Sequence, residues 1–389
     1  MASDPNLTII VHDSLASLEE LRPEWEKLLG EYPHSTIFST YEWLSPWWRA
    51  FGGLNRLQVL AFRDESSALV ALAPLAVTIQ PTFPLSLRVL RMMGDGSHDS
   101  DNLDFPVRPG CEEAFSRALL DWMQQHSARW DICELNTLPE DSVLGARLPV
   151  ELARRRWKCV ASMRPQTVVE LAETWEAYLA GISSKERGKI GLRTRRLEKK
   201  FDVCIRRCSQ ESEIDSLLEA LFELHGKHWK ERGLPGTLGS PVRRQFYAEL
   251  ARLLLSQGRL EFWTLELSGK IVAAQFGLRY GTTVFSLQEG FDPEYAADSV
   301  GYVLRSLVLK QIIGEGIRRY DFLGGTDESK MRWGGKLKKY LNLHFARPLS
   351  RGSLHLTAKS GSGQTKDWLR THLPAGVWRG LKSAAGKRK

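Results

Sequence analysis

The sequence predicts an α/β protein built from two like units in tandem. A β-hairpin pattern at Leu57–Leu75 recurs at Leu260–Leu278, and a helical segment follows each copy. Each copy then closes with an aromatic–aspartate pair that enters a short strand, Trp130–Asp131 in the first and Tyr320–Asp321 in the second. Because strands mixed with helices favour sheets covered by helices, each unit should be a mixed sheet flanked by helices. We expect a small-molecule site where the two units meet.

Length and composition indicate a folded protein of about two domains. The chain has 389 residues, of which 42% are hydrophobic and 26% are charged, and a domain holds ~150 residues. The five cysteines form neither a CxxC pair nor a Cys/His cluster, so we expect a reducing compartment without disulfides or a metal site. The N-terminus lacks a signal-peptide pattern, and the most apolar stretch, residues 68–79, is shorter than the ~20 residues of a membrane span. We therefore expect a cytoplasmic protein.

The net charge of +8 belongs to the C-terminal end. Residues 351–389 contain nine of the 54 basic residues and one of the 46 acidic residues, so the rest of the chain is neutral. A basic protein is a candidate for nucleic-acid binding when the charge covers a domain face. Here it does not, and no helix-turn-helix, zinc or RNA-binding signature accompanies it. We do not expect nucleic acid as a partner.

The first unit is expected to span residues 1–160. Leucines and Trp25 recur at helical spacing over Leu15–Gly30, and Ser39 or Thr40 can cap an aromatic helix that ends at a glycine pair. The predicted elements that follow from such spacing are helices at Leu15–Gly30, Tyr41–Phe51, Cys111–Ser127 and Asp141–Arg156, a hairpin at Leu57–Ile79, a polar loop at Gly94–Asp104, and a strand at Asp131–Leu135.

The second unit is expected to span residues 161–349. It contains a helix at Ser183–Lys200 with eight Lys/Arg against two Glu, a density that suits either bound phosphates or a solvated face. The other predicted elements are a short strand at Val168–Leu171, helices at Ser212–Glu231, Val242–Gln257 and Tyr302–Glu315, a sheet over residues 259–291, and a strand at Arg319–Leu323 that opens into a polar loop reaching Trp333.

The last segment, residues 350–389, is predicted to be a basic linker and tail. A Ser/Gly/Lys stretch at residues 350–366 indicates the linker. Trp368–Lys389 combines aromatic and aliphatic side chains with cations, which suits contact with an anionic membrane surface, but Pro374 and Gly376 interrupt it. The segment is therefore either a peripheral membrane contact or a disordered end.

Several runs resemble a known family. Phe38–Trp48, followed by Ala73–Leu75, resembles the opening of the CelD/BcsL-type acetyltransferases of cellulose biosynthesis, which belong to the GNAT superfamily. The matching runs of the second half are Ser184–Ile190, His225–Gly233, Gly290–Tyr295 and Asp321–Trp333. The resemblance covers residues 8–348 approximately, and a more distant one links the chain to the Fem family. It implies tandem GNAT-like units, acetyl-CoA or another acyl-CoA as donor, and an amine or hydroxyl of a sugar or polysaccharide precursor as acceptor.

The loop and helix start at Tyr295–Tyr302 is the candidate donor site. A loop that enters a helix offers free N–H groups and the positive end of the helix dipole to phosphate. Ser299, Gly301 and Tyr302 are the residues expected to bind there. Only Gly301 fits the closely spaced glycines of GNAT proteins, and Asp298 would repel phosphate unless it caps the helix.

The strand Phe285–Phe291 precedes this loop as the acyl-presenting strand does in GNAT proteins, so the resemblance implies that it presents the acyl group. Its backbone N–H groups can hold the thioester carbonyl as an oxyanion-type site. Gln288 and Gly290, near its end, are expected to bind the donor, and Glu289 lies between them. Glu289 is a candidate general base, although an exposed glutamate at the end of a strand is the more common case.

Two polar loops are expected to hold the acceptor. In the loop after Asp321, that aspartate is a candidate base, Lys330 can pair with a phosphate or carboxylate, and Trp333 can stack on a sugar or belong to the core. In the first unit, a candidate base and two candidate acceptor ligands occur together; they are His98, Asp101 and Asp104. His225 is a further candidate for binding the acceptor, but it can equally be a packing residue.

The resemblance, together with these candidate residues, implies an acyl-CoA-dependent acyltransferase, with acetyl the expected acyl group, acting on a sugar or cell-surface polysaccharide precursor. Two alternatives remain open. One is Fem-like aminoacyl transfer to a peptidoglycan precursor, which would require charged tRNA. The other is a non-catalytic GNAT-like subunit of a polysaccharide synthesis complex, because the glycine pattern at residues 295–302 is poor.

Overall fold

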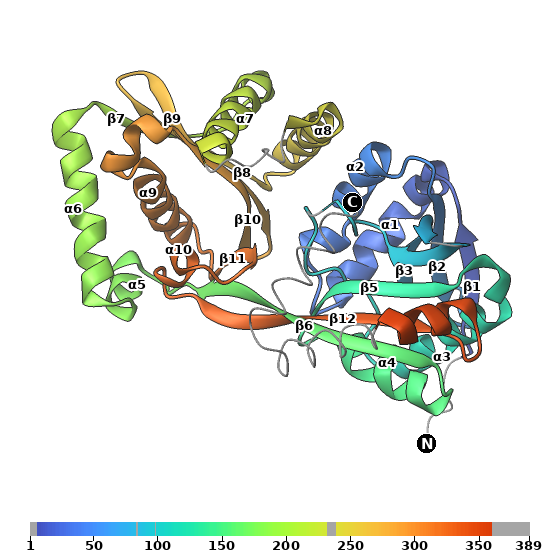
Figure 1. Cartoon of the computed structure of the whole chain (residues 1–389). Helices are drawn as coiled ribbons and strands as arrows, with labels where there is room; N and C mark the ends of the chain where they lie inside the picture. Colours follow the sequence, from blue (N-terminus) through green and yellow to red (C-terminus); the bar gives the residue numbers. More distant parts are fainter. Residues whose placement is uncertain (1–5, 83–84, 98, 232–238, 360–389) are drawn as a thin grey trace, which may run out of the picture.

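A mixed sheet of 12 strands runs through the described part of the protein, as a computed structural model shows (Figure 1). The structure describes residues 6–82, 85–97, 99–231 and 239–359. The strand order is β1-β2-β3-β4-β5-β12-β6-β11-β10-β9-β8-β7. The N-terminal unit therefore occupies one end of the sheet and the C-terminal unit the other, which confirms an α/β fold of two like units.

The N-terminal unit has its predicted elements in the predicted order, together with two strands that were not predicted, β1 (Thr8–His12) and β4 (Leu85–Met92). Thr40 caps α2 by accepting from the Trp43 N–H, as the sequence predicted. The elements are β1 Thr8–His12, α1 Leu15–Glu31, η1 Ile37–Ser39, α2 Tyr41–Phe51, β2 Arg56–Arg63, β3 Leu69–Thr82, β4 Leu85–Met92, α3 Glu112–Gln125, η2 Ser127–Arg129, β5 Ile132–Pro139, α4 Val143–Arg154 and β6 Lys158–Glu170.

The C-terminal unit repeats this order with two additional helices, α5 and α6, at its beginning. Its elements are α5 Trp175–Gly181, α6 Ser184–Lys200, β7 Val203–Arg207, η3 Glu211–Glu213, α7 Ile214–Glu231, α8 Pro241–Ser256, β8 Leu260–Leu267, β9 Lys270–Tyr280, β10 Thr283–Phe291, η5 Pro293–Asp298, α9 Val300–Gly314, β11 Arg319–Gly324, α10 Glu328–Met331 and β12 Lys336–Ala346.

Two long strands join the units. β12 pairs with β6 from Lys336–Val168 to Ala346–Lys158 and also pairs with β5, so the last of the described strands completes the sheet of the N-terminal unit. Figure 1 shows β6 and β12 crossing between the two lobes. The sequence predicted only Val168–Leu171 of β6, and residue 160, the expected unit boundary, falls inside this strand.

Helices cover both faces of the sheet. α1, α2, α7 and α8 lie on one face around one hydrophobic core that extends through both units, and Trp43 of α2 meets Phe246 of α8 with ring centroids 5.4 Å apart. On the other face of the C-terminal unit, α9 packs with α5 and α6 around a second core (Figure 1). This second layer, beside β10 and β11, positions the candidate site.

The segment predicted as a linker begins as a helix. Residues 351–359 are helical, and Leu356 is buried against β4, β5 and β12. Gly352 is required there, because a Cβ atom at this position would lie 1.9 Å from the Asp131 carbonyl oxygen. The proposed membrane contact at Trp368–Lys389 lies outside the described residues. Among the helices that the structure describes, none has the length and apolar character to cross a bilayer.

Candidate active site

The candidate site begins where β10 and β11 separate. The two parallel strands pair only from Thr283–Arg319 to Phe285–Asp321. β10 then carries a bulge between Ser286 and Gln288, which changes its direction while it stays paired with β9. Beyond Phe285, the edge of β10 that faced β11 therefore has backbone N–H groups outside the β10–β11 ladder. This is the geometry in which a strand can bind the carbonyl oxygen of a ligand.

A cavity of about 330 Å³ lies between this strand and the start of α9. Ser299 has a left-handed backbone (φ 58°), and its carbonyl accepts from the N–H groups of Tyr302 and Val303. The side chain of Ser299 does not cap the helix, so the N–H groups of Val300 and Gly301 precede the helical hydrogen bonds and are available to a ligand. The residues lining the cavity are Arg193, Ala274, Gln275, Glu289, Gly290, Phe291, Ala296, Ser299, Val300, Gly301, Tyr302, Leu304, Arg305, Ser329, Arg332 and Trp333.

The structure brings four of the five predicted donor-binding residues to this cavity, namely Gly290, Ser299, Gly301 and Tyr302. Asp298, which the sequence left as either a cap or a repulsive charge, is neither. Its carboxylate pairs with Lys200 of α6 at 2.7 Å. The negative charge beside the helix start is therefore neutralised by the basic helix.

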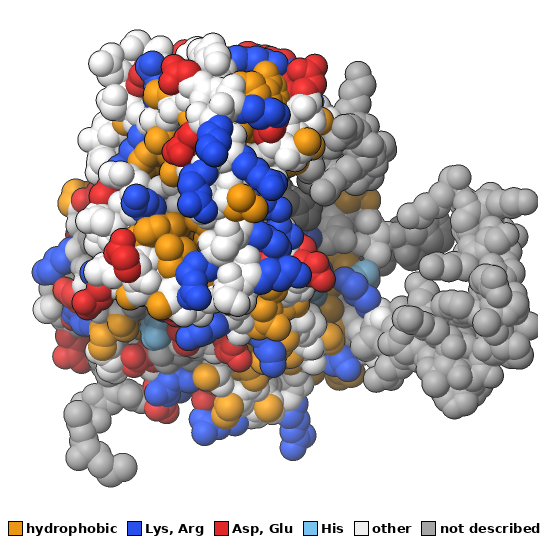
Figure 2. All heavy atoms as spheres, turned by 90° about the vertical axis from the view of Figure 1, so that its left-hand side faces the viewer, with side chains coloured by type: hydrophobic (Ala, Val, Ile, Leu, Met, Phe, Trp, Pro, Cys, Tyr) orange, Lys and Arg blue, Asp and Glu red, His pale blue; other side chains and the backbone are white. Residues whose placement is uncertain are grey.

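Three arginines of the cavity wall were not predicted. Arg193 of α6 lies 4.4 Å above the Tyr302 ring, Arg305 comes from the second turn of α9, and Arg332 follows α10. Figure 2 shows Lys and Arg side chains gathered on the face that α6 forms. The charge density of residues 185–200 was the available sequence signal, but the residue of α6 that lines the cavity could not be chosen without the fold.

An aromatic pair forms one wall. Tyr302 and Trp333 lie 4.6 Å apart at 33°, and the Tyr178 hydroxyl donates to the Trp333 carbonyl at 2.9 Å. Burial and the nearby Glu186 raise the pKa of Tyr302 to about 12, so its hydroxyl stays protonated. Trp333 is 1% exposed, so it belongs to the core, which was one of its two predicted roles. The other role, stacking on a sugar, would require an open surface.

A second cavity of about 720 Å³ adjoins the first, and Glu289 and Arg305 line both. It contains the predicted residues Gln288, His225 and Lys330. Gln288 lies there instead of in the donor cavity, and its side chain hydrogen-bonds to Tyr247.

The backbone around this second cavity is tightly packed. A Cβ atom at Gly290 would lie 2.6 Å from the backbone nitrogen of His225, so this glycine permits the close approach of α7 to β10. Lys330 Nζ donates to the carbonyls of Phe322, at 3.0 Å, and Gly324, and burial lowers the pKa of this amine. Lys330 thus holds the end of β11 in addition to lining the cavity.

Asp101 and Asp321 form a buried junction between the units. The Gly324 N–H donates to Asp101 at 3.0 Å, and the Leu323 N–H donates to Asp321 at 2.8 Å. The Asn102 amide lies between Asp321, at 3.5 Å, and the Tyr340 hydroxyl, at 3.4 Å.

This junction raises the pKa of both carboxyls. Burial raises the pKa of Asp101 to about 7, and the Gly324 N–H opposes the shift while the charge of Asp321 adds to it. Burial likewise raises the pKa of Asp321 to about 6. Asp321 lines neither of the two adjoining cavities but a separate one of about 250 Å³ between the units.

Asp104 does not have the predicted role. Its carboxylate is 2% exposed and accepts from the Tyr32 hydroxyl at 2.6 Å, the Ser142 hydroxyl at 3.0 Å and the Phe105 N–H at 2.9 Å. Burial raises the pKa of Asp104 to about 6. These contacts leave no free face for an acceptor, so Asp104 is a structural residue of the N-terminal unit. His98 lies outside the described residues.

Comparison with known proteins relates the C-terminal unit to the acyltransferases. Residues 184–331 match the model of a family described as an acetyltransferase (GNAT) domain. This segment runs from α6 to α10 and includes all residues that line the second cavity and all but Arg332 and Trp333 of those that line the first. It supports an acyltransferase, whereas no finding singles out the CelD/BcsL type. No curated protein matches the chain.

Solved structures share the fold of almost the whole chain. FemX has a TM-score of 0.61 at 12% identity, covering 86% of this chain and 96% of that one. A conserved protein of unknown function from Bacteroides thetaiotaomicron has a TM-score of 0.53 at 12% identity, covering 87% and 100%. A tandem GNAT protein from the clavulanic acid biosynthesis pathway has a TM-score of 0.50 at 11% identity, covering 88% and 99%. The fold is therefore that of tandem GNAT-like units.

Proposed function

We propose that this protein transfers an acyl group from acyl-CoA, with acetyl-CoA the expected donor, to an amine or hydroxyl of a sugar or cell-surface polysaccharide precursor. The observation that carries the proposal is the cavity at the start of α9, where free N–H groups meet Arg193 and Arg332. A pyrophosphate has only acceptor atoms and negative charge, and both features complement it. The proposed reaction uses acyl-CoA as co-substrate and includes no metal ion.

The thioester would then lie along β10. Its carbonyl oxygen accepts from an N–H on the edge of β10 beyond Phe285, which stabilises the negative charge that develops as the acceptor attacks. The new bond joins the acceptor nitrogen or oxygen to the acyl carbon, and the carbon–sulfur bond breaks. The sulfur leaves as a thiolate, and the proton lost by the nucleophile passes first to a carboxylate of the protein.

Glu289 is the proposed proton acceptor. Its side chain is 52% exposed, lines both cavities and is held by Arg305 through an ion pair. A carboxylate in this position reaches both a donor in the first cavity and an acceptor in the second. Asp321 was a second predicted base, but it faces the junction between the units. The third, His98, lies outside the described residues. We assign to Asp321 and Asp101 the role of fixing β11 against the N-terminal unit.

The sugar or polysaccharide acceptor rests on the family resemblance and on the size and polarity of the second cavity. Aminoacyl transfer from charged tRNA is a second candidate, and the basic surface of α6 is the feature that favours it (Figure 2). A peripheral membrane contact through Trp368–Lys389 stays a prediction. Co-sedimentation with anionic vesicles tests it, and the truncated chain should end at residue 359 because residues 351–359 pack on the N-terminal unit.

Calorimetry with acetyl-CoA, followed by a free-thiol assay with amino sugars and polysaccharide precursors, tests the donor. We expect binding that Arg193→Met weakens about 10-fold, as for the loss of one charge-assisted contact. Arg196→Met is the matched control, since Arg196 is an exposed arginine of the same helix outside the cavity. Absence of heat with acyl-CoA would exclude the proposal, and turnover that requires charged tRNA would establish the second candidate.

A further inference from the structure

Two buried polar atoms on the wall of the donor cavity have no hydrogen-bond partner among the described residues. They are Oε1 of Gln275, on β9, and Nε of Arg305, on α9. Gln275 is 4% exposed and Arg305 is 7% exposed, and both residues line the cavity. Buried polar groups are nearly always hydrogen-bonded, so atoms of this kind beside a cavity indicate a partner that enters it.

Glu289 fixes the orientation of both side chains. Gln275 and Glu289 are cross-strand neighbours on β9 and β10, and Gln275 Nε2 lies 3.5 Å from Glu289 Oε2. The same carboxylate oxygen pairs with Arg305 Nη2. Because the opposite amide orientation would place Gln275 Oε1 against the carboxylate, the oxygen is the free atom. Arg305 is also held over the Phe322 ring, with Cζ 4.8 Å from its centroid.

The unpartnered atoms thus form one hydrogen-bond acceptor and one hydrogen-bond donor, flanking a single carboxylate. A phosphate or a thioester carbonyl supplies only acceptors, which would leave Gln275 Oε1 unsatisfied. A secondary amide supplies one N–H and one carbonyl, which complements the pair. The part of acyl-CoA between its pyrophosphate and its sulfur, the pantetheine arm, contains two such amides.

We propose that Gln275 and Arg305 recognise a secondary amide of the pantetheine arm, whose N–H donates to Gln275 Oε1 and whose carbonyl accepts from Arg305 Nε. This inference rests on the proposed acyl-CoA donor and extends it to two residues that select the arm rather than the nucleotide. They are positioning residues, because they bind the donor away from the reacting carbonyl.

An unpartnered atom alone does not mark a site, and the protein contains a matched control. Gln58 of β2 is 5% exposed, and its Nε2 also has no partner among the described residues, yet Gln58 takes no part in the donor cavity. Gln58→Leu and Gln275→Leu therefore remove the same group from equally buried strand positions, and they differ in whether the donor cavity adjoins it.

Calorimetry with two ligands tests the proposal. Acetyl-CoA contains the pantetheine arm, and adenosine 3′,5′-bisphosphate contains adenine and phosphates without the arm. We expect Gln275→Leu to lower the affinity for acetyl-CoA about 5- to 30-fold, since a buried hydrogen-bonding group of the ligand loses its partner. The affinity for the bisphosphate should not change, and Gln58→Leu should change neither affinity.

Arg305→Lys is the second variant, because it keeps a cation for Glu289 and removes the Nε donor. It should show the same selective loss, which keeps the test decisive if Gln275→Leu does not fold, as thermal unfolding will show. Equal losses for both ligands, or no loss in Gln275→Leu, would overturn the amide contact and leave only water at these atoms. If the unmodified chain binds neither ligand, the proposed function fails together with this inference. If it binds both with equal affinity, only the inference fails.

Discussion

In the N-terminal unit, the parallel strands β4 and β5 part after Arg91 and Glu134, just as β10 and β11 part after Phe285 and Asp321 in the C-terminal unit. We call the place where the two parallel strands separate the notch of each unit. In the N-terminal unit, side chains bridge this notch. Asn136 of β5 donates to Asp95, beyond the end of β4, at 2.9 Å, and it also pairs with His344 of β12 at 2.9 Å. The C-terminal unit has a cavity in the corresponding place.

The helix that starts beside each notch shows the same contrast. α3 begins with Glu112 and Glu113, and the Gly110 N–H donates to the Glu112 carboxylate at 2.9 Å. α9 has no acidic residue in its first turn, and the second residue of the helix is Gly301 instead of Glu113. Since a helix start favours one negative partner, the N-terminal unit supplies its own and the C-terminal unit leaves the place to a ligand.

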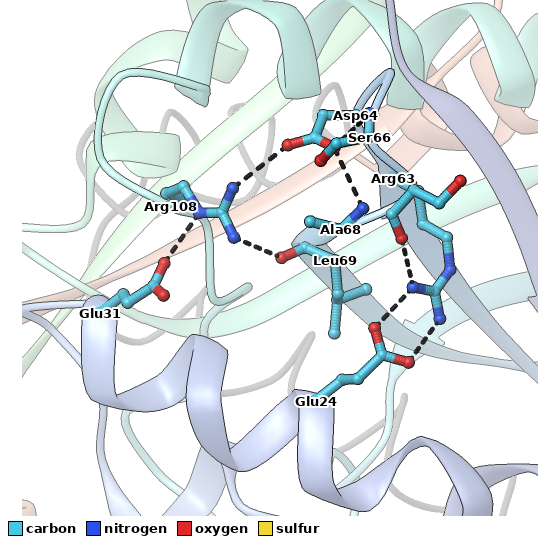
Figure 3. Close-up of polar contacts among 9 residues, drawn as sticks. Glu24, Glu31, Arg63, Asp64, Ser66, Ala68, Leu69 and Arg108 are labelled. Carbon is cyan, nitrogen blue, oxygen red and sulfur yellow. Dashed lines mark hydrogen bonds and ion pairs between the residues drawn. The ribbon is translucent and has the colours of Figure 1, made fainter.

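The segment leading into α3 is also fixed, as Figure 3 shows. Arg108 pairs with Glu31 at 2.8 Å and Asp64 at 3.3 Å, and it donates to the Leu69 carbonyl at 3.2 Å. Backbone hydrogen bonds hold Pro106 and Arg108 along β3. The same architecture therefore serves packing in one unit and, on our proposal, donor binding in the other.

Converting the C-terminal helix start into the N-terminal type should have the largest effect. Gly301→Glu places a carboxylate where the pyrophosphate is proposed to bind, and a Cβ atom there lies 3.3 Å from the Phe291 ring. We expect acetyl-CoA affinity in calorimetry to fall at least ~100-fold, because a like charge replaces a free helix start. The reciprocal control, Glu113→Gly in α3, should leave the affinity unchanged. Comparable affinities in the two variants would show that the contrast between the helices is not functional.

Substitution of the aspartate in each aromatic–aspartate pair, Asp131 or Asp321, should change the pH dependence of the free energy of unfolding in opposite directions. Burial alone would raise the pKa of Asp131, but the hydrogen bonds and charge of Arg88 lower it overall. Asp131 therefore stabilises the fold above its unfolded pKa, and this contribution is lost as pH falls through the folded pKa. Asp131→Asn should cost about 2 kcal/mol in urea unfolding at pH 8, since Arg88 loses its charged partner.

Asp321→Asn should behave oppositely. Its folded pKa, about 6, is raised, so its contribution to stability is full below the unfolded pKa and is lost as pH rises through 6. The free energy of unfolding of Asp321→Asn, relative to that of the unmodified chain, should therefore rise by about 1–3 kcal/mol as the pH increases from 4 to 8. A parallel pH dependence for Asp131→Asn and Asp321→Asn would contradict the distinction between the two aspartates.

The smallest effect is expected from the ion pairs in Figure 3. Arg108→Met should lower the free energy of unfolding by about 1 kcal/mol, because the arginine side chain is 29% exposed and its ion pairs are partly screened. Arg63→Met, which breaks the neighbouring pair with Glu24, is the companion variant. Neither substitution should change the dissociation constant of acetyl-CoA. A change in this constant would give the N-terminal unit a part in donor binding.

The repeated hairpins, the helices and the helix start at Gly301 could be predicted from the sequence because each has a local signal of spacing or capping. β6 and β12 could not. Residues 161–165 of β6 are exposed, so the strand has no alternating pattern, and pairing with β12 stabilises it instead. This pairing joins residues far apart in the chain, which no local pattern can indicate.

The same distinction applies to the candidate site: residues with a local sequence signal could be predicted, and residues that converge from distant elements could not. Ser299, Gly301 and Tyr302 lie on one short segment, and the structure brings them to one cavity. Arg193, Gln275 and Arg305 reach the same cavity from α6, β9 and α9, so their convergence depends on packing. Asp104 was misjudged because a polar loop predicts exposure, whereas this loop is buried in the N-terminal unit and at its junction with the C-terminal unit.

A crystal structure of the chain with bound CoA would examine the contrast between the units most directly. We expect a single CoA, with its pyrophosphate at the Val300 and Gly301 N–H groups and its arm between β10 and Arg305. CoA bound between β4 and β5, or an empty cavity in crystals grown at saturating CoA, would contradict the assignment of donor binding to the C-terminal unit.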